Sequence, residues 1–105
     1  VLTPMQPSPL DLWATKPVVD AAQVADRPVR LILNRVPPRS KLTDGLITAS
    51  QSLGVELLAN QLGARVAFPS AMARGLTALE TEPRGRAAAE SLALTTEIFA
   101  LLRSI

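Results

Sequence analysis

The sequence predicts an α/β fold in which about three parallel strands alternate with helices. Apolar residues make up 48% of the chain and aromatic residues only 3%, which favours helices packed on a buried sheet over a β-sandwich. Short apolar runs at residues 1–5, 29–36 and 55–59 are each followed by a segment with helical periodicity. Such repeated strand–helix–strand units imply right-handed crossovers and therefore a parallel sheet.

The first element, at residues 1–5, has the features of a strand end, because no turn or cap precedes it. Prolines then impose an extended loop, since proline fixes φ and restricts the residue before it. Ser8 is the expected N-cap of a helix over residues 9–25, and Pro9 takes its first position.

Within that helix, Pro17 predicts a kink or a division into two short helices. We expect Trp13 to pack in the core or in an interface. The expected inner stripe consists of Leu10, Trp13, Ala14, Val18, Ala21, Ala22 and Ala25.

The second strand, at residues 29–36, is a nearly continuous apolar run, as in a strand covered on both faces. Ser40 is the expected cap of the next helix, which ends near residue 53, and Gly54 supplies its C′ glycine. The expected inner stripe of this helix is Leu42, Leu46, Ile47, Ala49, Ser50 and Leu53.

The C-terminal part begins with the third strand, at residues 55–59. A short helix over residues 64–74 follows, and we expect Pro69 to interrupt it. The clearest helix covers residues 86–103. Its expected inner stripe is Ala89, Leu92, Ala93, Thr96, Phe99, Ala100 and Leu102.

The composition excludes several kinds of site. There are no cysteines and no histidines, which removes disulfides, thiol and imidazole catalysis and Cys/His zinc sites. We expect no metal site, no membrane span and no signal peptide in this chain. A net charge of +2 permits contact with nucleic acid without demanding it.

Four segments resemble ParA-family partition ATPases, in order and at suitable spacing. The first, with the sequence V-L-T-P-M-Q-P-S-P-L-D, resembles the family's P-x-x-P-S-P-L-D segment, and L-I-L-N-R-V resembles its strand ending in Asn-Arg. The stretch G-A-R-V-A-F-P-S-A-M-A-R-G-L-T-A-L-E resembles the segment R-x-A-[FY]-x-x-A-x-x-x-G-x-x-x-x-E. The run R-A-A-A-E, followed by a long helix, resembles the family's C-terminus.

The resemblance implies that residues 1–105 are the C-terminal part of a P-loop ATPase domain whose Walker A half is absent. The chain has no G-x-x-x-x-G-K-[ST] loop, and its two lysines are Lys16 and Lys41. We therefore expect ATP and Mg²⁺ to bind in an intact parent protein. Neither is expected to bind tightly to this chain alone, which should have no ATPase activity.

The same resemblance assigns candidate nucleotide contacts. Asn34 is expected at the adenine, where an amide both donates to and accepts from a base edge. Arg35 follows it, and Pro7, Ser8 and Pro9 belong to a loop placed near the nucleotide or the dimer face. The alternative for Asn34 is a polar strand end that caps a nearby loop.

The resemblance also implies that an ATP-bound dimer binds DNA without sequence preference and is released by a centromere-binding partner. The candidate DNA contacts are Arg65, Arg74, Arg84 and Arg86, although single arginines more often serve solubility and helix-end pairing. We attribute Glu90 to its place near a helix start. The expected location is the cytoplasm, in association with the nucleoid.

The sequence leaves two alternatives open. A MinD-like or cobyrinic-acid-synthase-like relative shares the fold, but MinD-like proteins end in a basic amphipathic helix, and here residues 101–105 carry one basic residue. A non-enzymatic interaction module without a P-loop is the other. A first strand with an open side would also favour a homodimer or a strand-exchanged oligomer.

Overall fold

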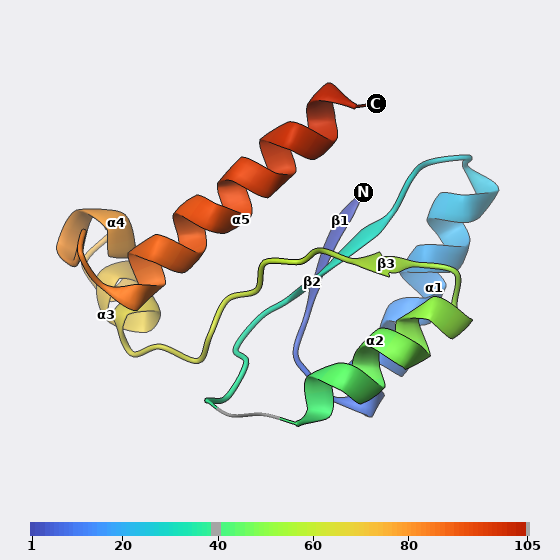
Figure 1. Cartoon of the computed structure of the whole chain (residues 1–105), viewed down its shortest axis with the longest axis horizontal. Coiled ribbons are helices and arrows are strands. Elements are labelled where there is room, and N and C mark those ends of the chain that lie inside the picture. Colours follow the sequence, from blue (N-terminus) through green and yellow to red (C-terminus); the bar gives the residue numbers. More distant parts are fainter. Residues whose placement is uncertain (39–40, 105) are drawn as a thin grey trace.

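The computed structural model describes residues 1–38 and 41–104. Strands and helices alternate through residues 2–57, and helices follow in the rest of the chain (Figure 1). The elements are β1 (Leu2–Met5), α1 (Pro9–Val24), β2 (Arg30–Leu33), α2 (Leu42–Ser52), β3 (Glu56–Leu57), α3 (Ala67–Ala73), α4 (Ala78–Thr81) and α5 (Arg86–Arg103). The predicted α/β class is confirmed. Helix α4 was not predicted from the sequence. It begins with a capping box formed by Thr77 and Glu80.

The sheet has three strands in the order β1-β2-β3, and both pairings are parallel. Met5 pairs with Leu33, so β1 and β2 end at the same edge of the sheet. Figure 1 shows α1 and α2 together on one side of the strands and α5 on the other. The three-stranded parallel sheet flanked by helices is therefore confirmed.

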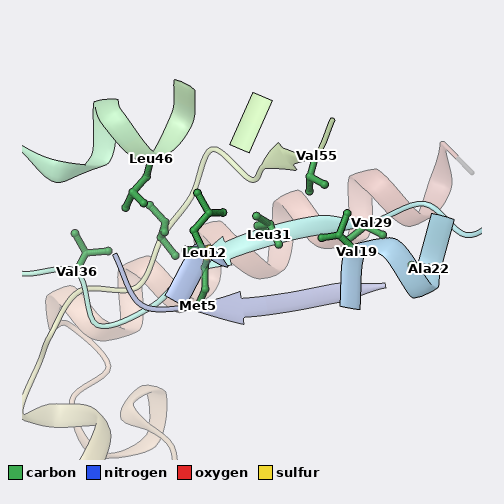
Figure 2. Close-up of a cluster of buried hydrophobic side chains, with 10 residues drawn as sticks. Met5, Leu12, Val19, Ala22, Val29, Leu31, Val36, Leu46 and Val55 are labelled. Atoms are coloured by element: carbon green, nitrogen blue, oxygen red, sulfur yellow. The ribbon is translucent and has the colours of Figure 1, made fainter. Parts of the chain in front are cut away.

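The main core lies between the sheet and the layer formed by α1 and α2 (Figure 2). Successive strand residues point to opposite faces. Leu31 and Leu33 accordingly join Leu12 of α1 and Leu46 of α2 in the core, while the buried Ile32 points to the other face. Burial on both faces of β2 explains why the sequence there is a continuous apolar run.

Helix α1 begins where the sequence predicts. Ser8 is the N-cap, and its Oγ accepts the Asp11 N–H at 3.0 Å. Pro9 occupies the first helical position, where a missing N–H costs nothing. Pro17 lies inside one continuous helix, so the division into two short helices is wrong.

The inner stripe predicted for α1 is also wrong, apart from Ala22. The structure buries Leu12, Thr15, Val19 and Ala22. Trp13 is 74% exposed and Leu10 is 70% exposed, so Trp13 is not a core residue. Helix α1 therefore carries apolar residues on its exposed side as well as on its buried side.

Helix α2 has Lys41 as its N-cap, without a side-chain cap; the predicted cap, Ser40, lies outside the described residues. The inner positions Leu46, Ala49, Ser50 and Leu53 are confirmed, Ile47 is 41% exposed, and the side chain of Leu42 lies outside the described part. Gly54 has φ +73°, and the N–H groups of Gly54 and Val55 donate to Gln51 and Ser50. This Schellman motif confirms the predicted C′ glycine.

Pro69 does not interrupt α3. The helix begins at Ala67, so Pro69 occupies its first turn, where backbone N–H groups have no helical partner. The stripe predicted for α5 is wrong, because that helix turns Ala87, Ala88 and Leu94 inward. The expected inner residues Leu92, Phe99 and Leu102 are 55–59% exposed.

Candidate functional site

Loops from two neighbouring strands meet at the carboxyl edge of the sheet. The segment after β1 begins at Gln6, and the segment after β2 begins at Asn34. The Asn34 N–H donates to the Met5 carbonyl at 2.8 Å, which joins the two segments directly. Ligands of open α/β sheets bind at this edge.

A pocket of about 490 Å³ opens there, between the segments that follow β2 and β3. Val36 bridges to Gly63 in parallel register and brings the two segments together. Such a volume lies within the usual range for small-molecule sites. The lining residues are Asn34, Arg35, Gly63, Ala64, Arg65, Val66, Phe68 and Pro69.

Asn34 lines this pocket and is half-buried. Its side-chain Oδ1 accepts the Arg35 N–H at 2.9 Å. Its NH₂ group carries two donors and Oδ1 has a second lone pair, so the side chain retains the groups that a base edge requires. Arg35 has φ +57°, a left-handed conformation that is uncommon for arginine. Strain of this kind often marks a functional segment.

Pro7, Ser8 and Pro9 lie at the same sheet edge without entering this pocket. Pro7 is buried, and Ser8 caps α1. Pro9 lines a separate groove between α1 and α2. The structure therefore brings Asn34 and Arg35 together and leaves the three other candidates outside.

Glu90 of α5 holds one wall of the pocket. Its carboxylate accepts from Arg65 Nε at 3.1 Å and Nη2 at 3.2 Å, and from the Gly63 N–H at 3.3 Å. The hydrogen bond to Glu90 raises the pKa of Arg65. Attributing Glu90 to its place near a helix start missed this role, because its partners lie about 25 residues earlier in the sequence.

Glu97 holds the same loop at a second point. Its two carboxylate oxygens accept the backbone N–H groups of Ala59 and Asn60 at 2.8 Å. Burial opposes ionisation of Glu97, but these bonds and a third from Asn60 Nδ2 outweigh it, and the pKa of Glu97 is lowered. Two carboxylates about two turns apart on α5 thus fix the segment between β3 and α3.

The residues present do not fit a magnesium site. Within residues 1–38 and 41–104, no group of three or more acidic side chains gathers. The sequence also lacks a glycine-rich loop with a lysine for phosphates. What the pocket offers is the Asn34 amide, the Phe68 ring and the Arg35 guanidinium, together with Arg65, whose guanidinium is engaged by Glu90.

No known protein-family profile matches this chain. The chain is 32% identical over 97 residues to the Maintenance of carboxysome distribution protein A of Halothiobacillus neapolitanus. The match covers 88% of this chain and 45% of that protein, so the chain spans a little under half of its relative's length. The match supports a relation to the ParA/MinD family.

The arginines expected to contact DNA divide into two groups. Arg74 is the C-cap of α3, Arg84 lies between α4 and α5, and Arg86 begins α5; all three are exposed. Figure 1 shows α3, α4 and the start of α5 gathered at one end of the molecule. Arg65 differs from these three, because its guanidinium is engaged by Glu90.

The helices described by the structure include none with the length and apolar character needed to cross a membrane.

Proposed function

We propose that this chain supplies the base side of the nucleotide site of a ParA-type partition ATPase. In the intact protein, ATP with Mg²⁺ drives dimerisation and the dimer holds DNA without sequence preference. Hydrolysis stimulated by a centromere-binding partner then releases the DNA. Action in the cytoplasm on the nucleoid follows from this role.

The observation that carries the proposal is the pocket that unites Asn34 with the segment from Gly63 to Pro69. Both segments belong to motifs that resemble the family, and the parallel packing of β2 and β3 and the Val36–Gly63 bridge bring them together. In this pocket Asn34 reads the base edge and Phe68 offers an apolar wall. When bound, ATP brings its own phosphates, for which this chain offers no cradle.

The test is an NMR titration of the chain with ATP, with inorganic tripolyphosphate as the comparison. We expect weak ATP binding, with a Kd on the order of 1 mM, that shifts the amide signals of Asn34, Gly63, Ala64 and Phe68. Asn34→Ala should abolish these shifts, whereas the exposed control Gln23→Ala should leave them unchanged. Equal shifts with tripolyphosphate, or shifts elsewhere in the chain, would refute the base-side assignment.

A second candidate cargo comes from the relative, whose name assigns it to carboxysome distribution. The same ATPase chemistry serves either cargo, so only the partner differs. Imaging of cells that lack the gene separates the two. Loss of plasmids or unequal chromosomes would identify a DNA cargo, and clustered carboxysomes with normal DNA inheritance would identify the other.

A further inference from the structure

An apolar groove of about 550 Å³ runs between α1 and α2. Its floor consists of Leu12 and Leu46, whose side chains are buried. Gly45 and Ala49 keep the α2 side of the groove shallow. The groove therefore offers apolar surface on two neighbouring helices, separate from the pocket at the sheet edge.

Trp13 forms part of the α1 wall of this groove and is 74% exposed. It is the single tryptophan of the chain. Leu10, three residues earlier on the same helix, is 70% exposed. Large exposed apolar side chains beside a groove mark surfaces that bind other molecules.

Two lysines are the charged side chains among the residues that line this groove. The two lysines of the chain, Lys16 and Lys41, both line it, one from α1 and the other at the start of α2. Lys16 Nζ lies 2.8 Å from Asp20 Oδ2, in a pair whose side chains are about half exposed. Such an exposed pair is weak and exchanges readily with another carboxylate.

Lys41 is a poor N-cap, because its side chain has no acceptor for the helix N–H groups, although Asp44 in the first turn complements the helix dipole. The groove thus combines an apolar floor, an exposed tryptophan and a lysine on each side.

We propose that this groove docks an acidic amphipathic helix of a partner protein. Apolar side chains at helical spacing would fill the floor beside Trp13, and carboxylates flanking that stripe would meet Lys16 and Lys41. A second copy of the chain fits less well, because it would bring like charges together. The proposal is independent of nucleotide binding.

The test uses a synthetic helical peptide with leucines at helical spacing and glutamates on both flanks, and a matched peptide with lysines in place of the glutamates. Trp13 fluorescence reports docking directly. We expect a saturable blue shift and about tenfold tighter binding of the glutamate peptide at low salt, with a smaller preference at high salt. Lys16→Glu combined with Lys41→Glu should reverse the preference, and Arg27→Glu, outside the groove, should not.

A second variant keeps the proposal testable if charge reversal disturbs folding. A Cβ built on Gly45 meets no atom within 4 Å, so Gly45→Leu should fill the groove and preserve the helix. It should abolish peptide binding while circular dichroism stays unchanged. Equal binding of both peptides, a concentration-dependent blue shift without peptide, or preferential binding to anionic vesicles would overturn the proposal in favour of general adhesion, self-association or a membrane surface.

Discussion

At the residue scale, Glu97 shows how one side chain of α5 stabilises a distant loop. Its carboxylate accepts three hydrogen bonds from Ala59 and Asn60. Glu97→Gln keeps the shape of the side chain but replaces its two charged carboxylate oxygens with one neutral amide oxygen, which is a weaker acceptor. We expect a loss of about 1–3 kcal/mol in the free energy of unfolding, measured by urea denaturation at neutral pH.

The lowered pKa of Glu97 gives this contribution a pH dependence of known sign. Its pKa in the unfolded chain is near the ordinary value of 4.5, and its pKa in the folded chain lies below that. The stabilisation is therefore complete above about pH 4.5 and is lost as the pH falls through the folded pKa. The difference in stability between the wild type and Glu97→Gln should shrink over that window; a constant difference from pH 7 to pH 3 would contradict the assignment.

The exposed arginines carry a prediction about DNA. In the intact protein with ATP, changing Arg74, Arg84 and Arg86 to Ala should weaken DNA binding. It should also reduce the slope of log affinity against log salt by about 0.9 for each DNA phosphate that the variant no longer neutralises. Arg65→Ala should act mainly through the pocket wall, because Arg65 is engaged by Glu90. If binding does not fall when all four are changed, the DNA assignment is wrong; Arg27→Ala is the control.

Sequence reasoning succeeded at residues whose roles are local. Ser8 and Gly54 were predicted from neighbours within a few positions, and Asn34 was placed at a strand end for the same reason. Glu90 and Glu97 were missed because their partners lie 25 to 38 residues away in the sequence. A carboxylate at helical spacing carries no signal of such partners.

At the scale of elements, the sequence located α1 and α5 but not their buried faces. Each helix carries apolar residues on more than one face, as Trp13 and Phe99 show by remaining exposed. Periodicity detects a helix, whereas the packing of the chain around it decides which stripe is buried. The two prolines expected to break helices also depend on context. Pro17 is accommodated inside α1, and Pro69 lies within the first turn of α3.

Replacing either of two glycines in the α2 region with alanine should change the stability of the chain, in opposite directions for the two positions. Gly54 has φ +73°, so Gly54→Ala strains the Schellman motif and should destabilise the chain by about 1–2 kcal/mol. Gly45 lies inside α2 with open space at its Cβ, so Gly45→Ala should stabilise the chain by about 0.5–1 kcal/mol. Thermal unfolding of both variants checks the pair, and shifts of the same sign would contradict it.

At the scale of the whole molecule, the alternation of strands and helices was enough to predict the parallel sheet. The pocket at its edge was not predicted from the sequence, because Gly63 to Pro69 reach Asn34 through pairing that no local pattern encodes. The sequence also lacks a phosphate-binding loop, and this affects what the chain as a whole can catalyse.

The chain alone should not hydrolyse ATP, because phosphoryl transfer requires a phosphate cradle and bound magnesium that its residues do not provide. The measurement is phosphate release with Mg²⁺ and DNA present. Release that persists through rigorous purification and is reduced by Asn34→Ala would overturn the prediction.

We predict that this chain associates with itself. Among the described residues β1 pairs only with β2, and the Val1 and Met5 carbonyls accept from β2 and the residue after it. Alternation along the strand then directs the backbone groups of Leu2 and Pro4 to the open edge. Pro4 has no N–H, which weakens strand addition there without preventing it.

Exposed apolar surface adds a second reason for association. Leu92, Phe99 and Leu102 lie at helical spacing on α5 and are 55–59% exposed. Light scattering coupled to size exclusion should therefore show a mass that rises with concentration. Leu92→Ser with Phe99→Ser should reduce association through α5, and Leu2→Lys should reduce association through the edge. A clean monomer at high concentration, with cooperative unfolding, would mean that the three-stranded sheet and its helices form a self-sufficient domain.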